Sequence, residues 1–150
     1  MTKRKTPVLS ICIPTHNRAD FLETNLKQLA KISDPKDVEI VVADDFSDDS
    51  TGEVVSKFKK RHSNFTVRYR KFPQRVYFDK MVLGVIRLAR GRFCWLLGDD
   101  DLPAVGSISI ILKTISTHPR VSLIHLNYSR FDNVLKKVTA KRMVGDIRKD

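Results

Sequence analysis

The sequence predicts an α/β domain with a mostly parallel sheet and helices on both faces. Three observations lead to this prediction: apolar, β-rich runs recur along the chain, helical patterns separate them, and most runs are almost continuously apolar. Such runs are typical of strands buried on both faces of a parallel sheet, and their alternation with helices implies right-handed crossovers. The five expected strands are Val8–Ile13, Val38–Ala43, Val67–Tyr69, Phe93–Leu97 and Val121–Leu126.

The first two connecting helices are predicted by their start signals. Asp20 with Glu23 resembles a capping box, and leucines at helical spacing follow it. Ser50 with Glu53 repeats this signal ahead of a second apolar stripe. We therefore expect a helix to begin near each of these residue pairs.

The last two helices are predicted by an apolar stripe and by the positions of glycine and proline. The third stripe runs from Phe78 to Ala89, and Gly91 fits as its stop. Pro103 can open a fourth helix, which ends before Pro119. Together these elements predict one domain over residues 1–127, followed by an irregular C-terminal tail over residues 128–150.

Composition excludes several classes of protein. Apolar residues make up 41% of the 150 residues, which is too many for a disordered chain. The longest unbroken apolar run, Phe93–Leu97, has five residues, whereas a membrane span needs roughly 20. Cys12 and Cys94 both lie in apolar runs, so we expect small buried hydrophobic residues in a reducing, cytoplasmic compartment rather than a disulfide.

The formal net charge of +11 is concentrated in one window, because twelve basic residues and a single acid lie between Lys57 and Arg92. One interpretation is a solvated surface that aids solubility. The other is attraction to polyanions such as phosphates, anionic lipid headgroups or nucleic acid. The sequence has no RNA-recognition, zinc-finger or helix-turn-helix signature, so specific nucleic-acid binding is not expected.

Acidic residues gather after two expected strands, on the sheet edge where ligands of such folds bind. They are Asp44, Asp45, Asp48 and Asp49 after the second strand, and Asp99, Asp100 and Asp101 after the fourth. Adjacent carboxylates repel one another unless a cation or hydrogen-bond donors compensate, and oxygen ligands favour Mg²⁺ or Mn²⁺. We expect Asp48 and Asp49 to cap the helix that follows them. For the second group a metal site is favoured, since three consecutive acids cannot all serve as one cap.

The first strand ends in polar residues at the same edge. Pro14 lacks an N–H group and is expected to end strand pairing. His16 has a flat ring suited to stacking on a nucleotide base, and Thr15 or Asn17 can form hydrogen bonds to a nucleotide. The same residues suit an ordinary β-to-α loop, and on their own they favour that interpretation.

Three segments occur in a fixed order along the chain: Leu9–Arg18 (LSICIPTHNR), Glu39–Ser50 (EIVVADDFSDDS) and Gly91–Pro103 (GRFCWLLGDDDLP). Together they resemble family 2 glycosyltransferases with the GT-A fold, a Rossmann-like α/β fold. The third segment is similar to branches that build bacterial surface polysaccharides, including abequosyltransferase-like enzymes. The resemblance covers only the donor-binding half of such enzymes, so residues 128–150 are either an irregular tail or the start of a truncated acceptor region.

The resemblance implies a metal-dependent glycosyltransferase domain that binds a nucleotide-diphospho-sugar donor and transfers the sugar to a glycan or lipid-linked acceptor. It also implies a Mg²⁺ or Mn²⁺ cofactor, which neutralises charge on the leaving nucleoside diphosphate. No acid after Asp101 matches the family's catalytic carboxylate, so the catalytic residue stays unknown. Carried over by position, the donor-binding residues are Pro14, Thr15, His16, Asn17, Asp45, Lys80 and Asp99, and the metal ligands are Asp100 and Asp101.

Two other functions stay open on the sequence. The unmatched catalytic carboxylate favours a non-catalytic nucleotide-sugar-binding module or remnant. The basic window favours a domain that binds an anionic surface, either membrane or nucleic acid, although three acids at the expected cleft would repel a polyphosphate. Peripheral contact with the inner face of a membrane is compatible with a cytoplasmic glycosyltransferase, because many sugar acceptors are lipid-linked.

Overall fold

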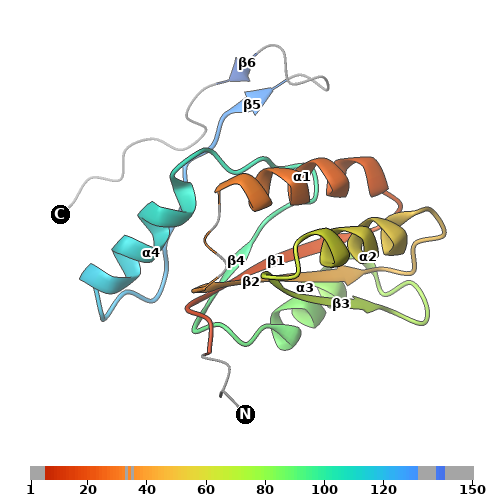
Figure 1. The fold of residues 1–150 in the computed structure, drawn as a ribbon, viewed down its shortest axis with the longest axis horizontal. Helices are drawn as coiled ribbons and strands as arrows, with labels where there is room; N and C mark the ends of the chain where they lie inside the picture. The colour runs from red at the N-terminus through yellow and green to blue at the C-terminus, as the bar shows by residue number, and fades with distance from the viewer. Residues whose placement is uncertain (1–5, 33, 35, 132–137, 141–150) are drawn as a thin grey trace. The chain divides into compact units, whose positions relative to one another are not determined.

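The computed structural model describes residues 6–32, 34, 36–131 and 138–140. The chain separates into two units, Met1–Ser116 and Thr117–Asp150. The first unit holds a four-stranded sheet with its helices, and the second holds a pair of short strands (Figure 1). The domain boundary expected after residue 127 stays a prediction.

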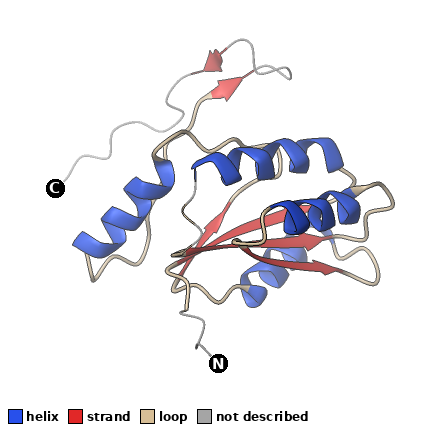
Figure 2. Ribbon diagram, in the orientation of Figure 1, coloured by secondary structure: helices blue, strands red, loops and turns tan. Residues whose placement is uncertain are grey.

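The first unit has the expected alternation of strands and helices (Figure 2). Its elements are β1 (Leu9–Thr15), α1 (Ala19–Ile32), β2 (Val38–Asp44), α2 (Thr51–Arg61), β3 (Thr66–Lys71), α3 (Tyr77–Leu88), β4 (Phe93–Leu96) and α4 (Ser107–Thr117). The strands are all parallel and lie in the order β3-β2-β1-β4. Figure 1 shows α1 and α2 on one face of this sheet and α3 on the other, so helices cover both faces as predicted.

β1 and β2 form the centre of the core, because each is paired on both sides and lies between layers of helices. Every residue of both strands is buried. On the α3 side, Cys12 and Val41 pack in one apolar cluster with Met81 and Val85. Consecutive strand residues point to opposite faces, so Ile11 and its neighbours in register face α1 and α2. This burial on both faces explains why the two strands are almost continuously apolar in sequence.

The prediction of a fifth strand is wrong. Val121–Leu126 has no strand conformation, and the described residues place no strand beside it. Backbone groups need partners to form a strand, and the side chains of this run are not buried as a core strand requires, since Leu123 is 83% exposed. The second unit instead contains a short antiparallel pair, β5 (Arg130–Phe131) and β6 (Val138–Ala140).

Two helix boundaries differ from those expected. α3 ends before Ala89, which is already extended, so Gly91 does not end the helix. The glycine is needed for a close approach instead, because a Cβ atom there would lie 2.6 Å from the backbone nitrogen of Ser10. α4 begins after Gly106, whose φ of +85° turns the chain into the helix, and not at Pro103.

Only one of the two cysteines is buried. Cys12 lies in the core, as predicted, whereas Cys94 is exposed on β4. The two residues share one face of the sheet, but α3 packs on β1 and β2 and leaves β4 uncovered on that face. Both thiols are free. Within the described ranges, no helix is both long enough and apolar enough to cross a membrane. The cytoplasmic location expected from the cysteines stays a prediction.

A buried carboxylate ties the amino ends of three strands together. Glu39 of β2 accepts hydrogen bonds from the Ser10 hydroxyl at 2.6 Å, the Arg68 Nε at 2.9 Å and the backbone N–H of Arg90 at 2.5 Å. Burial raises the pKa of Glu39, but these donors outweigh burial and hold the pKa below its ordinary value. The carboxylate is therefore a structural anion at the end of the sheet opposite the acidic loops.

Candidate functional site

The loops that follow β1, β2 and β4 meet at the carboxyl edge of the sheet. The Thr15 hydroxyl donates to Asp99 Oδ2 at 2.7 Å, and the Thr15 carbonyl accepts the backbone N–H of Asp45 at 2.9 Å. Thr15 therefore contacts both acidic loops at once. This arrangement follows from the topology, because β1 lies between β2 and β4 and all three strands run in the same direction.

Pro14 lies within β1 and does not end it, contrary to expectation. It is in register with Ala43 of β2, and the strand continues to Thr15. The pairing of β1 with β4 stops at Cys12, opposite Leu96. The missing N–H of Pro14 therefore falls where β1 has already lost one of its two neighbours, and a proline is tolerated there.

Asp99 is the most deeply buried acid of the 99–101 group, with 4% of its surface exposed. Thr15 donates to one of its carboxylate oxygens, and Arg18 Nη1 lies 3.2 Å from the other. Burial raises the pKa of Asp99 and the neighbouring charge of Asp100 adds to this, while the Thr15 hydroxyl and the Arg18 charge act in the opposite direction. The pKa stays above its ordinary value.

Asp100 and Asp101 are exposed and have different partners. Arg18 Nη2 donates to Asp100 Oδ2 at 2.8 Å. Asp101 Oδ2 accepts the backbone N–H of Gly98 at 3.2 Å, which closes a tight turn within the loop. The structure thus brings Asp99 and Asp100 together on one guanidinium and directs Asp101 back to its own loop.

Asn25 of α1 holds the loop of Asp99–Asp101 in place through two hydrogen bonds. Its Nδ2 donates to the carbonyls of Gly98 at 3.0 Å and Asp101 at 2.6 Å, and the side chain is buried. Asn25 is absent from the residues predicted for the site. Its sequence signal is an amide on the apolar stripe of a helix, between Leu22 and Leu26, where an unpaired polar group would be costly.

Asp45 is buried and caps the amino end of α3. Its Oδ1 accepts the backbone N–H of Val76 at 2.6 Å, and its Oδ2 accepts that of Tyr77 at 3.1 Å. Arg75 Nε lies 3.3 Å from the same Oδ2. The carboxylate thus interacts with the positive end of the helix dipole and with a guanidinium. Its expected contact with a nucleotide stays a prediction.

His16 is held in one tautomer by its two neighbours. Nδ1 lies 2.7 Å from the carbonyl of Asp45, which can only accept, so Nδ1 carries the proton. Arg75 Nη1 lies 2.8 Å from Nε2 and can only donate, so Nε2 is the acceptor. The ring is therefore held in one orientation at the centre of the site. Arg75 is a second residue that the sequence predictions did not include.

The other two residues predicted to bind the donor differ in their surroundings. Asn17 bridges the first two loops, because its N–H donates to Ser47 Oγ at 2.9 Å and its Oδ1 accepts the N–H of Asp48 at 2.8 Å. Lys80 is exposed on α3, and it forms no hydrogen bond or ion pair with any part of the chain that the structure describes. The structure does not bring Lys80 to the acids.

Backbone strain is concentrated around Asp45 and His16. Among the residues that the structure describes, three non-glycine residues have positive φ angles: Asn17 at 51°, Phe46 at 62° and Tyr77 at 61°. Each of them adjoins His16 or Asp45 in sequence or bonds to one of them. Such conformations cost roughly 1–3 kcal/mol each and are common at ligand sites. This clustering supports a functional role for the edge of the sheet where the loops meet.

Asp49 joins two helices rather than one. Its Oδ2 accepts the N–H of Ala19 at the start of α1 at 3.0 Å, and its Oδ1 accepts the N–H of Thr51 in α2 at 2.9 Å. The predicted capping role of Asp49 is confirmed and extended to α1. Asp48 is exposed, and its carboxylate accepts no hydrogen bond from the described residues, so the capping role expected for it is wrong.

We expect Asp49→Ala to lower the free energy of unfolding by about 1–2 kcal/mol at pH 7, since two helices lose a cap. Burial raises the pKa of Asp49, but hydrogen bonds from Thr51 and Ala19 outweigh it and lower the pKa overall. A lowered native pKa means that this stabilisation is present near neutrality and is lost as the pH falls through that pKa. Urea denaturation at pH 7 and pH 3 measures both; an equal difference at the two pH values would contradict the assignment.

The acids suit a cation that is completed by another molecule. Asp99 Oδ1 and Asp100 Oδ2 converge on one positive group. Among the described residues, no cluster of three or more His, Cys, Asp and Glu is arranged to hold a metal ion. Mg²⁺ in proteins is commonly held by one or two carboxylates together with substrate phosphates. The residues therefore fit a phosphate-completed cation site and not a preformed cage.

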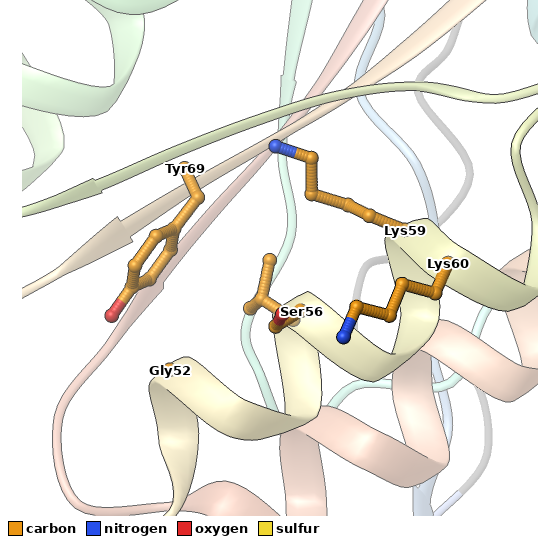
Figure 3. Close-up of a pocket in the computed structure, with 6 residues that line it drawn as sticks. Gly52, Ser56, Lys59, Lys60 and Tyr69 are labelled. Atoms are coloured by element: carbon orange, nitrogen blue, oxygen red, sulfur yellow. The ribbon is translucent and has the colours of Figure 1, made fainter.

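A groove of about 480 Å³ lies elsewhere, between α2 and β3 (Figure 3). None of the residues predicted for the site lines it; its lining is Gly52, Val55, Ser56, Lys59, Lys60 and Tyr69. The Tyr69 hydroxyl donates to Asp44 Oδ2 at 2.5 Å, while Asp44 Oδ1 accepts the N–H of Ser47. Asp44 therefore holds β3 and its own loop together.

Comparison with known proteins places this geometry in context. The family model described as glycosyl transferase family 2 matches residues 10–149. Abequosyltransferase RfbV of Salmonella typhimurium is 33% identical over 77% of this chain and 35% of its own length. The GalNAc(5)-diNAcBac-PP-undecaprenol β-1,3-glucosyltransferase of Campylobacter jejuni is 33% identical over 71% of this chain and 34% of its own length. The chain thus spans about a third of the length of these relatives.

Solved structures show the same fold. The mannosyltransferase PcManGT of Pyrobaculum calidifontis, in complex with GDP-Man and Mn²⁺, matches 75% of this chain and 33% of its own with a TM-score of 0.68 and 22% identity. S. aureus TarS, in complex with UDP-GlcNAc, matches 83% of this chain and 38% of its own with a TM-score of 0.68 and 22% identity. The predicted GT-A fold, limited to one part of such enzymes, is confirmed.

Proposed function

This chain belongs to glycosyl transferase family 2, and on that premise we propose that it binds a nucleotide-diphospho-sugar donor with Mg²⁺ or Mn²⁺ at the carboxyl edge of its sheet. The observation that carries the proposal is the position of Thr15, which bonds to the loops of Asp45 and Asp99 at once. Acids far apart in sequence thereby meet beside His16, whose ring is oriented by the Asp45 carbonyl and Arg75. Two of the solved neighbours are described with nucleotide-sugar donors, which supports this ligand class.

The residues divide between the nucleoside and the diphosphate. The His16 ring offers a flat surface to a base, with Pro14, Thr15 and Asn17 in the same loop. Asp45 can also serve the nucleoside through Oδ1, which accepts only the Val76 amide among the described residues, whereas Oδ2 already accepts from Tyr77 and Arg75. Lys80 would have to reach the base or diphosphate by extending from the surface of α3. These assignments rest on position, and binding experiments with variants test them.

The acids of the 99–101 group would bind the ribose and the cation of the leaving nucleoside diphosphate. We assign Asp99 to the ribose side, with its carboxylate held by Thr15, and Asp100 with Asp101 to the cation. Asp101 accepts the Gly98 amide through Oδ2, which leaves its Oδ1 for the cation. A bound divalent cation supplies neutralisation of charge on the departing nucleoside diphosphate. Sugar transfer would go to a glycan or lipid-linked acceptor, as the name of the Campylobacter relative indicates for that protein.

Membrane contact is a further part of this proposal. A lipid-linked acceptor would lie at the cytoplasmic face of the membrane. Lys59 and Lys60 beside the groove in Figure 3 have no ion-pair partner among the residues described, so they are free to meet anionic headgroups. Vesicle co-sedimentation with and without phosphatidylglycerol tests this. Equal binding to neutral vesicles, or none to either kind, would contradict it.

Calorimetry with UDP-, GDP-, CDP- and dTDP-sugars in the presence of Mn²⁺ tests donor binding. We expect one of these donors to bind, and we expect Asp100→Asn to weaken its binding at least tenfold. Asp48→Asn is the matched control, because it makes the same change at an exposed carboxylate that has no hydrogen bond with any described part of the chain. Failure of all donors to bind the folded protein would contradict the proposal. Binding without transfer or donor hydrolysis would favour the non-catalytic alternative.

A further inference from the structure

Arg18 occupies the place between the two acids that converge at this edge. Its Nη1 lies 3.2 Å from Asp99 Oδ1, and its Nη2 lies 2.8 Å from Asp100 Oδ2. One guanidinium thus pairs with two adjacent carboxylates, one on each terminal nitrogen. Adjacent carboxylates repel one another, and this positive charge is what offsets the repulsion in the structure.

The Arg18 guanidinium is partly exposed to solvent, whereas the Asp99 carboxylate that it contacts is buried and hydrogen-bonded to Thr15. The Arg18 side chain is 40% exposed, and its Cζ lies 4.6 Å from the centre of the Phe21 ring. The Arg18 carbonyl accepts the N–H of Leu22 at the start of α1, so its backbone is fixed. The second oxygen of Asp99 remains bonded to Thr15. The head of Arg18 can therefore swing away without displacing Asp99.

A divalent cation held by Asp100 and the Arg18 guanidinium would compete for Asp100 Oδ2, and the guanidinium at Asp99 Oδ1 would lie directly beside that cation. A guanidinium has no acceptor atom, so it cannot ligate a metal, and two positive groups at one site repel each other. Once displaced, the guanidinium is a bidentate partner suited to phosphate oxygens. A cation that arrives with a diphosphate would therefore displace Arg18 onto a new anion, whereas a cation alone would leave Arg18 unpaired.

We propose that Arg18 neutralises Asp99 and Asp100 until the donor binds. Cation binding would therefore depend on the donor diphosphate, which accepts Arg18 when the cation displaces it. The proposal rests on the proposed function and adds a positioning residue to it. It predicts that the wild-type protein binds Mn²⁺ weakly alone and more tightly with a nucleoside diphosphate. The coupling is reciprocal, so Mn²⁺ strengthens nucleotide binding by the same factor.

Arg18→Met tests this, because methionine keeps an apolar stem against Phe21 and removes the charge. We expect Mn²⁺ alone to bind the variant about tenfold more tightly than it binds the wild type, and the gain from nucleotide to shrink by a similar factor, within the usual range of such coupling. Arg18→Lys keeps the charge without the fork and should give intermediate values. Arg61→Met is the matched control at an exposed arginine on α2, and it should resemble the wild type.

The readout is the free Mn²⁺ signal in electron paramagnetic resonance, titrated with and without UDP or GDP, together with the thermal midpoint of each variant. Weaker or unchanged binding of Mn²⁺ alone to Arg18→Met would overturn the inference, provided that the wild type binds Mn²⁺ with nucleotide. If the wild type binds no Mn²⁺ with any nucleoside diphosphate, both the proposed function and the role of Arg18 are contradicted. Should Arg18→Met not fold, Arg18→Gln serves the same comparison.

Discussion

Replacing Asp45 with alanine is expected to reduce both the stability of the fold and the binding of nucleotide. The substitution leaves the part-buried amides of Val76 and Tyr77 without their acceptor and removes one partner of Arg75. Because Tyr77 is exposed and water can reach its amide, we place the loss of unfolding free energy at about 1–3 kcal/mol. Urea denaturation measures this loss, and donor calorimetry measures the second effect on protein that remains folded.

Asp45→Asn separates the two effects. An asparagine keeps one carbonyl oxygen for the amide of Val76, so we expect it to recover about half of the lost stability. Nucleotide binding should stay weak, because the negative charge beside His16 and Arg75 is gone. An Asp45→Ala variant with wild-type stability would show that the cap on α3 contributes little. A stable variant with undiminished nucleotide affinity would remove Asp45 from the site.

Replacing Glu39 with alanine is expected to cause the largest loss of stability away from the site. The buried carboxylate has three donors, and its removal leaves the hydroxyl of Ser10, the amide of Arg90 and the charge of Arg68 without their acceptor. Breaking a buried ion pair by removing one partner costs about 3–5 kcal/mol. We place Glu39→Ala at the lower end, about 3 kcal/mol, because the Arg68 side chain is 30% exposed and reaches water.

The direction of the Glu39 pKa shift determines how the stability of the fold changes with pH. Because the native pKa lies below its ordinary value, Glu39 stabilises the fold above its unfolded pKa, and this contribution is lost as the pH falls through the lowered native pKa. The difference between wild type and Glu39→Gln should therefore shrink in acid. Donor affinity of the folded variant should match the wild type, since Glu39 lies at the opposite end of the sheet. A difference that grows in acid would contradict this account.

Much of the fold could be predicted because burial on both faces leaves a strong pattern. β1 and β2 are apolar throughout since helices cover both sides, and their ends are within two residues of the prediction. Val121–Leu126 has a similar composition but no neighbouring strand, and pairing is a property of the partner as much as of the run. Gly91 was assigned to a helix end because its true neighbour, Ser10, lies 81 residues away in sequence.

The site was predictable in position and less so in detail. Alternating strands and helices are enough to place Asp45 and Asp99 at one edge, and the structure confirms that juxtaposition through Thr15. The cap that Asp45 provides for α3 and the two acids shared by Arg18 depend on side chains from distant loops. Asn25 lies on the apolar stripe of α1, and nothing in the sequence nearby links it to the loop that it binds. Such pairings are set by tertiary packing, for which a single sequence carries no local signal.

The central claim is that a divalent cation and a nucleoside diphosphate bind together where β1, β2 and β4 end. Broadening of backbone amide signals by paramagnetic Mn²⁺, in nuclear magnetic resonance spectra of the wild-type protein with UDP or GDP, locates that cation directly. The account predicts that the signals of Thr15, Asp45 and Gly98 broaden first and that those of Lys59 and Lys60 on α2 stay sharp. Broadening centred on α2, or none at any nucleotide concentration, would contradict it.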